Sequence, residues 1–182
     1  VPKIHILLSY FNINGLAEMS RYILHYGGHK FEDVRYSYAE WPVKEVKDSL
    51  PYGKMPIYEE NGRRLNQSVA IARYVGAISG LVPDDLWDIP IIVTCNKYVT
   101  NVTNMIYFFA NKTKYSNFSY GLTWISLSWA DFVFLSYIEN ADNILGSEVV
   151  KGYPALESLV KELQALPGVK EYIANRPAPA QT

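Results

Sequence analysis

The order of hydrophobic patterns in the first 80 residues constrains the fold more than any other feature of the chain. Residues 3–10 form an apolar stretch with β-branched side chains, which predicts a buried strand. Residues 15–26 carry apolar side chains at helical spacing, and Gly27-Gly28 ends this helix because glycine permits positive φ. Residues 31–36 then alternate as a second strand. This β-α-β order predicts two parallel strands joined by a helix.

The following segment predicts a short helix, a hairpin and a longer helix. Residues 41–50 form a charged helical segment, which a proline and a glycine then terminate. Asn61-Gly62 lies in the middle of residues 57–65, and this pair supplies the two positive φ angles of a type I′ turn between antiparallel strands. Residues 67–78 return to helical spacing.

The resulting order, β-α-β-α-β-β-α, is the thioredoxin-like arrangement, and the chain beyond it has no convincing strand alternation. Helices are predicted to begin at Pro83, Ser128, Pro154 and Pro167, the first of them reaching about Phe109. The fold class is therefore an α/β thioredoxin-like domain followed by an all-α domain. We expect the domains to cover residues 1–78 and 85–182, joined by a linker at 79–84.

Composition narrows the classes of function. About half of the residues are apolar and the net charge is only -1, with acids and bases interspersed, so we expect an ordered chain that binds no nucleic acid. Apolar runs such as 106–110 are too short to span a membrane, and polar residues interrupt the N-terminus where a signal peptide would be apolar. Cys95 is the only cysteine, which excludes an intrachain disulfide and favours a cytoplasmic location.

A thioredoxin-like domain usually carries Cys-x-x-Cys at its first helix, and one cysteine excludes that motif. A different set of motifs stands around the predicted strand ends, and together they closely resemble sigma-class glutathione transferases, a class that includes glutathione-dependent prostaglandin D synthase and the S-crystallins. The motifs are Ser9-Tyr10-Phe11-Asn12, Gly15-Leu16-Ala17-Glu18, Trp41-Pro42, Pro51-Tyr52-Gly53-Lys54-Met55-Pro56, Gln67-Ser68-Val69-Ala70-Ile71-Ala72-Arg73-Tyr74, the helix-capping box Ser128-Trp129-Ala130-Asp131 and the ending Leu166 to Pro177.

The resemblance implies a role for each motif. Tyr10 matches the tyrosine whose hydroxyl hydrogen-bonds the sulfur of glutathione and favours the thiolate. Met55-Pro56 matches a cis-proline turn that pairs with the cysteinyl backbone like an added strand. Gln67-Ser68 opens a helix whose positive end suits the γ-glutamyl carboxylate. Glutathione is thus the implied cosubstrate.

The glycyl end of glutathione is expected to meet Trp41, Lys47, Gly53 and Lys54. The stretch after Trp41 looks about two residues longer than in the family, so Lys44 could replace Lys47. Taken singly, each motif also has an ordinary structural explanation: a packed tyrosine, a trans proline, a helix-capping serine or a solvated lysine face. The resemblance to the family therefore depends on the combination of these motifs and not on any one of them.

Three departures separate this chain from the family pattern. Leu16 stands where many relatives have an arginine that helps to hold the thiolate. Aspartates that reach across the dimer to glutathione have no counterpart, because no acid lies between Asp88 and Asp131; Thr94 and Lys97 or Tyr98 take their places. Residues 110–127 are too few for the usual loop and long helix. A natural deletion or splice form, or residues missing from the sequence, would explain that shortening.

The resemblance implies a cytoplasmic, homodimeric detoxification enzyme that conjugates glutathione to a small hydrophobic electrophile without a metal. Phe11, Leu16, Tyr107 and Phe108 are the candidates for the electrophile pocket. Two alternatives remain open at this point. One is a glutathione-dependent isomerase of the prostaglandin D synthase type. The other is a non-enzymatic, S-crystallin-like or glutathione-binding structural protein.

Overall fold

The computed structural model describes residues 5–37, 41, 43–50, 52–100 and 126–178 of the chain. Its sheet has four strands in the order β2-β1-β3-β4. The outer pairing of β1 with β2 is parallel, as the sequence predicts, whereas β1 with β3 and β3 with β4 are antiparallel. The strands are β1 (Ile6–Phe11), β2 (Glu32–Tyr36), β3 (Ile57–Glu60) and β4 (Arg63–Asn66).

The hairpin between β3 and β4 confirms the prediction from its turn residues. Asn61 has φ 50° and Gly62 has φ 78°, so both turn positions are left-handed. Positive φ is strongly disfavoured for most side chains, which is why an Asn-Gly pair is such a specific signal. The hairpin register places Ile57 opposite Asn66.

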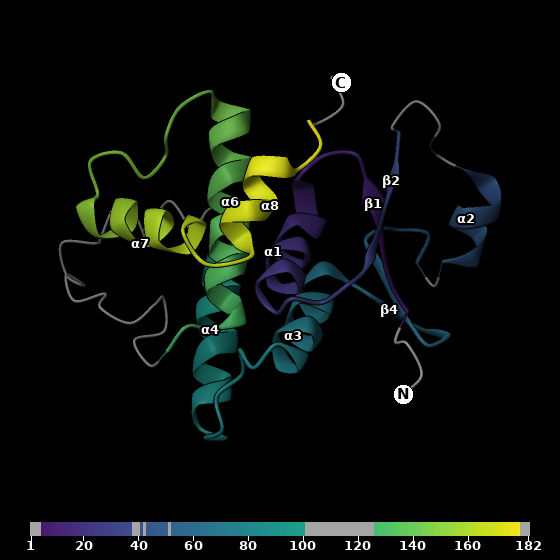
Figure 1. The fold of residues 1–182 in the computed structure, drawn as a ribbon, viewed down its shortest axis with the longest axis horizontal. Helices are drawn as coiled ribbons and strands as arrows, with labels where there is room; N and C mark the ends of the chain where they lie inside the picture. The colour runs from purple at the N-terminus through teal and green to yellow at the C-terminus, as the bar shows by residue number, and fades with distance from the viewer. Residues whose placement is uncertain (1–4, 38–40, 42, 51, 101–125, 179–182) are drawn as a thin grey trace.

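Helices lie on both sides of this sheet. A short 3-10 turn, η1 (Gly15–Ala17), leads into α1 (Glu18–Tyr26) after β1, and α3 (Ser68–Ile78) follows β4. Figure 1 shows α1 and α3 on one side of the sheet and α2 (Lys44–Ser49) on the other. Helices α1 and α3 bury side chains in this layered arrangement, whereas the described residues of α2 are exposed or half-buried.

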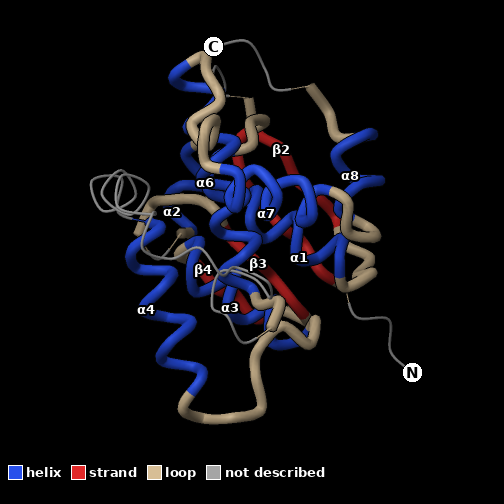
Figure 2. Tube along the Cα trace, turned by 90° about the vertical axis from the view of Figure 1, so that its left-hand side faces the viewer, coloured by secondary structure: helices blue, strands red, loops and turns tan. Residues whose placement is uncertain are grey.

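The chain then forms a helical domain. Its described helices are α4 (Asp88–Thr100), α6 (Trp129–Leu145), α7 (Pro154–Gln164) and α8 (Val169–Asn175). When the molecule is viewed from the helical side, the strands lie behind the helices (Figure 2). The last two helices begin where proline signals predict them, at Pro154 and just after Pro167.

One predicted boundary is wrong. The helix expected from Pro83 begins instead at Asp88. The Asp85 side chain accepts a hydrogen bond from the Trp87 backbone N–H at 2.8 Å, and the Asp85 carbonyl accepts one from Asp88 N–H at 3.1 Å. These local bonds hold a turn where the helix would otherwise start. The predicted end at Phe109 lies outside the described residues.

Helix α6 packs against α1 and α3 and forms the centre of the hydrophobic core. At its start, Asp131 Oδ2 accepts hydrogen bonds from Ser128 N–H at 2.8 Å and Ser128 Oγ at 3.0 Å, which confirms the capping box. A Cβ added to Gly76 of α3 would lie 2.5 Å from Cβ of Trp129. Only glycine therefore allows α3 to approach α6 this closely.

In the part of the chain that the structure describes, no helix combines the length and apolar character needed to cross a membrane. The boundary predicted at 79–84 stays a prediction. The shortened segment 110–127 lies almost wholly outside the described ranges, which resume at residue 126.

Candidate functional site

Three of the candidate residues lie side by side at one edge of the sheet. Ser9 of β1 pairs with Ile57 of β3, and Ile57 pairs with Asn66 of β4. The next residue on each of these three segments is Tyr10, Pro56 or Gln67, and these three residues form the row discussed below. Neighbouring strands lie about 4.8 Å apart, so the row spans about 10 Å from β1 to β4. An extended tripeptide is of about the same length.

Tyr10 is almost buried, with 6 % of its surface exposed. Its ring packs edge-on to Phe11 at a centroid distance of 5.2 Å, and the Arg21 guanidinium carbon lies 6.0 Å from the ring centroid. On another side the ring and hydroxyl rest against Gly15, where an added Cβ would lie 2.9 Å from the Tyr10 oxygen. The phenol is therefore held on several sides.

The middle and far end of the row have unusual backbone geometry. The Met55–Pro56 peptide bond is cis, which confirms that expectation. Gln67 has φ 74° and ψ 113°, a combination rare for a residue with a side chain, and its carbonyl accepts the N–H of Ile71 as the N-cap of α3. Non-glycine residues in such conformations concentrate at ligand sites. Ser68 is the first helical residue, so it does not act as the helix cap.

The predicted glycyl side of the site contains aromatic and lysine side chains. Trp41 packs edge-on against Phe11 at 5.4 Å and near Tyr36 at 6.2 Å. Lys47 runs along Gly53, because a Cβ added to that glycine would lie 3.7 Å from Lys47 Cε. Its alternative, Lys44, forms an exposed ion pair of 3.2 Å with Asp48. Lys54 is exposed.

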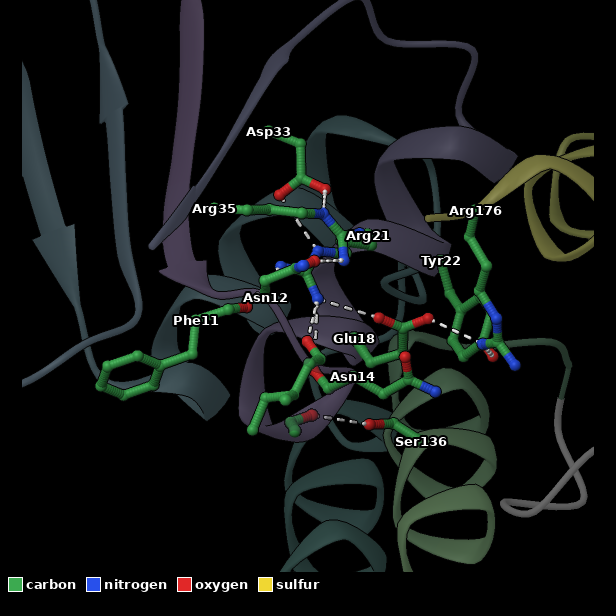
Figure 3. A network of polar contacts seen from close by, with 12 residues as sticks. Phe11, Asn12, Asn14, Glu18, Arg21, Tyr22, Asp33, Arg35, Ser136 and Arg176 are labelled. Atoms are coloured by element: carbon green, nitrogen blue, oxygen red, sulfur yellow. Dashed lines mark hydrogen bonds and ion pairs between the residues drawn. The ribbon is translucent and has the colours of Figure 1, made fainter. Parts of the chain in front are cut away.

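The structure reveals a functional candidate that the sequence patterns do not single out. Arg21 of α1 is completely buried, and its guanidinium lies inside the loop between β1 and η1 (Figure 3). It donates hydrogen bonds to the carbonyls of Ile13 at 2.8 Å and Asn14 at 3.3 Å, with a longer one to Phe11 O at 3.5 Å. Arg21 thereby fixes the backbone that follows Tyr10.

Acidic side chains balance this buried charge. Arg21 pairs with Glu18 at 3.0 Å and with Asp33 of β2 at 3.1 Å. Asp33 also pairs with Arg35 at 2.7 Å. Burial alone would lower the pKa of Arg21, but the Asp33 and Glu18 carboxylates outweigh it and raise that pKa. The guanidinium is therefore charged at all accessible pH values.

Glu18 also connects the loop to the end of the chain. Its two carboxylate oxygens accept hydrogen bonds from Arg176 Nη1 at 2.9 Å and from the Tyr172 hydroxyl at 3.1 Å. Arg176 reaches further, to Glu139 of α6 at 3.0 Å and to the Tyr22 hydroxyl at 2.8 Å. The network thus joins α1, α6 and α8.

The phenols of this network remain donors at neutral pH. Burial raises the pKa of Tyr22 well above its ordinary value, and Glu139, which accepts a hydrogen bond from the Tyr22 hydroxyl, raises it further. Burial and the Glu18 carboxylate likewise raise the pKa of Tyr172. Both phenols therefore stay protonated at neutral pH and donate to Glu139 and Glu18.

The helical domain contributes Tyr137 near Tyr10, and Asn140 and Ser136 against Gly15. Burial raises the pKa of the Tyr137 phenol on α6, and the nearby Tyr10 phenol raises it further. Asn140, one turn along α6, bonds to both polar groups of Gly15: Gly15 N–H donates to Oδ1 at 3.2 Å, and Nδ2 donates to Gly15 O at 3.3 Å. Ser136 Oγ lies 3.5 Å from the same carbonyl (Figure 3).

The electrophile-pocket candidates are only partly described. Phe11 is half-buried against Trp41, and Leu16 is 39 % exposed beside Gly15. Tyr107 and Phe108 lie outside the described residues. Of the positions where the family aspartates are missing, Thr94 bonds to the Pro90 carbonyl of its own helix at 2.8 Å, and nothing is described of the Lys97 and Tyr98 side chains.

A groove of about 440 Å³ lies on the α8 side of the polar network rather than at Tyr10. Charged side chains line it, and those of Arg35, Asp33 and Arg176 are already paired with one another or with Glu18 and Glu139. Tyr10, Pro56 and Gln67 do not line this groove. Its lining comes from α1, β2 and the α8 region, so the groove lies at the junction of the two domains. Its lining residues are His25, Asp33, Arg35, Glu171, Tyr172, Asn175, Arg176 and Pro177.

Comparison with known proteins gives a consistent result for both halves of the chain. Residues 7–77 match the model of the glutathione S-transferase N-terminal domain, and residues 94–176 match that of the C-terminal domain. Glutathione S-transferase S1 of Drosophila melanogaster is 32 % identical, over 93 % of this chain and 78 % of the fly protein. The chain belongs to the glutathione S-transferase family.

Other members of the glutathione S-transferase family match over nearly their whole length. Hematopoietic prostaglandin D synthase of Homo sapiens is 31 % identical over 93 % of this chain and 96 % of the human protein. That alignment has 196 positions, more than the 182 residues here, so the human protein has residues without a counterpart in this chain. A solved prostaglandin synthase D structure from Nilaparvata lugens superposes with a TM-score of 0.82 at 29 % identity, covering 96 % of this chain and 100 % of that one.

The family assignment confirms the sequence-based recognition and fold class. For this glutathione S-transferase, the structure places Tyr10, Pro56 and Gln67 in one row, with Ser68 directly after it. It adds Arg21, Tyr137 and Asn140, which the motifs did not suggest. The signal in the sequence that points to Arg21 is its position three residues after Glu18 within the predicted helix, where the two side chains share one face.

Proposed function

We propose that the chain conjugates the thiolate of glutathione to small hydrophobic electrophiles, with Tyr10 as the catalytic residue. The observation that carries this proposal is the row at the sheet edge, where Tyr10, the cis Met55–Pro56 bond and Gln67 lie side by side. A tripeptide laid along this row meets a hydroxyl, a strand-like backbone and a helix N-terminus in turn.

Each of the three parts of glutathione would meet groups that can bind it. The backbone at Met55 pairs with the cysteinyl unit, which places its sulfur toward Tyr10. The first turn of α3, opened by Gln67 and Ser68, offers N–H groups and a positive dipole end to the γ-glutamyl carboxylate. Trp41, Lys47, Gly53 and Lys54 would meet the glycyl end, where the lysines supply positive charge.

Tyr10 acts on the ionisation of the thiol. A hydrogen bond to a charged acceptor contributes about 1.5–3 kcal/mol, and one pKa unit corresponds to about 1.4 kcal/mol. A hydroxyl that bonds the thiolate therefore lowers the thiol pKa by about one to two units. The near-burial of Tyr10 strengthens the bond, because few solvent molecules compete with it. The electrophile would lie beyond the sulfur, toward Leu16 and Tyr137.

The test is conjugation of glutathione to a generic aryl halide by wild type and by Tyr10→Phe. We expect kcat/KM to fall about tenfold to hundredfold in this variant, in proportion to the lost thiolate. Tyr26→Phe is the matched control, because Tyr26 lies at the far end of α1 and packs against Phe132. Equal rates for wild type and Tyr10→Phe would remove Tyr10 from the mechanism.

An isomerase of the prostaglandin D synthase type is the second candidate, favoured by the similarity to the human and Nilaparvata lugens proteins. Against it stands Leu16, at the position where the resemblance expects an arginine. An endoperoxide offered to the wild-type protein decides between the two: rearrangement without loss of glutathione indicates the isomerase. Retention on immobilised glutathione with neither activity would indicate the structural role.

A homodimer is the proposed assembly. Exposed apolar side chains occur on α3 and around the start of α4, and patches of this kind usually mark an interface. We expect a second copy to cover them, in the cytoplasm. The residues are Tyr74, Ile78, Leu86, Trp87, Ile91 and Val93.

A further inference from the structure

One side chain of the helical domain, that of Asn140, pairs with both polar groups of the glycine that contacts the candidate catalytic tyrosine. Asn140 of α6 forms two hydrogen bonds with Gly15, one as acceptor and one as donor, at 3.2 and 3.3 Å. A backbone N–H can pair only with the amide oxygen, and a carbonyl only with the amide nitrogen, so the orientation of the amide is fixed. Asn140 therefore holds this backbone in the way that a neighbouring strand would.

Gly15 in turn forms the support on which Tyr10 rests. A Cβ at Gly15 would lie 2.7 Å from Cε1 and 2.9 Å from the hydroxyl oxygen of Tyr10, so the phenol is in direct contact with this residue. Gly15 has φ 45°, a left-handed conformation that glycine adopts without steric cost. A glycine that is free to adopt many conformations needs an external hold to keep one of them.

We propose that Asn140 is a positioning residue: by holding the Gly15 peptide groups, it sets the place of the Tyr10 hydroxyl against the thiol. The inference rests on the proposed function for its catalytic consequence, although the hold itself is independent of any ligand. It also means that the helical domain controls the reactivity of a site built on the thioredoxin-like domain.

Other side chains also bond to the loop that contains Gly15, and comparing their contacts shows what Asn140 adds. Arg21 binds the carbonyls of Ile13 and Asn14, which precede Gly15 and face α1. Ser136 offers Gly15 only one long contact of 3.5 Å. Asn140 alone among the described hydrogen bonds engages both sides of Gly15. Its loss should therefore leave the loop in place, with Gly15 O still bonded to the Glu18 N–H of the 3-10 turn, but leave the Gly15 N–H beside Tyr10 without its Asn140 acceptor.

The test compares Asn140→Ala with Asn143→Ala, an exposed asparagine almost one turn further along α6. We expect kcat to fall about tenfold in Asn140→Ala, less than the ~100-fold that a misplacement of 1 Å can cost. KM for glutathione should stay within about twofold, because the peptide-binding groups are untouched. The lower pH midpoint of kcat/KM should rise. Asn143→Ala should leave all three unchanged.

A role that is only structural would lower the unfolding temperature of Asn140→Ala while kcat and the pH midpoint stay as in wild type, and that result would overturn the proposal. If Asn140→Ala does not fold, Asn140→Asp serves instead, because it keeps the acceptor for Gly15 N–H and loses the donor. We expect it to show the same shift of the midpoint, and an unchanged midpoint would count equally against the proposal.

A ligand-free measurement separates this inference from the proposed function. The NMR signals of the Tyr10 ring and the Gly15 amide should move in Asn140→Ala and not in Asn143→Ala. If wild type shows no Tyr10-dependent conjugation, the proposed function fails while this hold can still be observed. If the Tyr10 signals are the same in both variants, the positioning role is refuted even when conjugation is normal.

Discussion

Arg21→Met tests whether the buried ion pairs stabilise the loop that carries Tyr10. The substitution keeps most of the apolar stem and removes the guanidinium, which leaves Glu18 buried with 0 % side-chain exposure. Breaking one side of a buried ion pair costs about 3–5 kcal/mol, because the remaining charge loses its compensation. Glu18 keeps Arg176 at 2.9 Å, and Asp33 keeps Arg35 at 2.7 Å, so we expect the lower end, about 3 kcal/mol.

Urea unfolding of wild type and Arg21→Met, followed by far-ultraviolet circular dichroism, measures this loss. The control is Arg63→Met on the exposed hairpin, for which we expect a change within about 0.5 kcal/mol. A loss below about 1 kcal/mol for Arg21→Met would refute the reasoning. A cycle with Glu18→Gln adds a second condition: the double variant should be more stable than the sum of the two single losses predicts, by about 1–3 kcal/mol.

Three further predictions follow from packing, titration and exposure. Gly76→Ala should lower the free energy of unfolding by about 1–3 kcal/mol in the same assay, because its Cβ would meet Trp129 at 2.5 Å. Burial lowers the pKa of His25 below its ordinary 6.5, so the unfolded chain takes up that proton first and stability is lost as the pH falls below about 6.5. His25→Phe, which keeps the stacking on Tyr172, should therefore show a smaller loss of unfolding free energy between pH 8 and pH 5; an identical loss would contradict the assignment. Light scattering should give twice the 20.7 kDa chain mass for wild type and a larger monomer fraction for Trp87→Ser, and a wild-type monomer would exclude the proposed dimer.

The sheet and most helices could be predicted because their signals are local. Asn61-Gly62 specifies its turn through backbone sterics alone, and Pro154 marks a helix start because the N–H that proline lacks would have no partner in the first turn of a helix. The helix start at Asp88 could not be predicted, because the Trp87 N–H bonds to the Asp85 side chain in place of a helical pattern, and apolar periodicity does not report such a bond.

The site could be predicted only as far as its motifs extend along the chain. The row of Tyr10, Pro56 and Gln67 follows once the strand order is known. The long-range partners of Glu18 could not be foreseen, because Arg176 lies 158 positions away in the sequence. Asn140 meets Gly15 through the packing of α6 on α1, which depends on side chains along the whole interface.

The central claim is that the Tyr10 hydroxyl stabilises the thiolate of bound glutathione, and the most direct test is a titration of that thiol. The ultraviolet absorbance of the thiolate is followed against pH in the complex of glutathione with wild type and with Tyr10→Phe. The account predicts a midpoint about one to two units below the ordinary thiol value of about 8.5 in wild type and a return toward it in the variant. The same midpoint in both proteins, with glutathione bound in each, would contradict it.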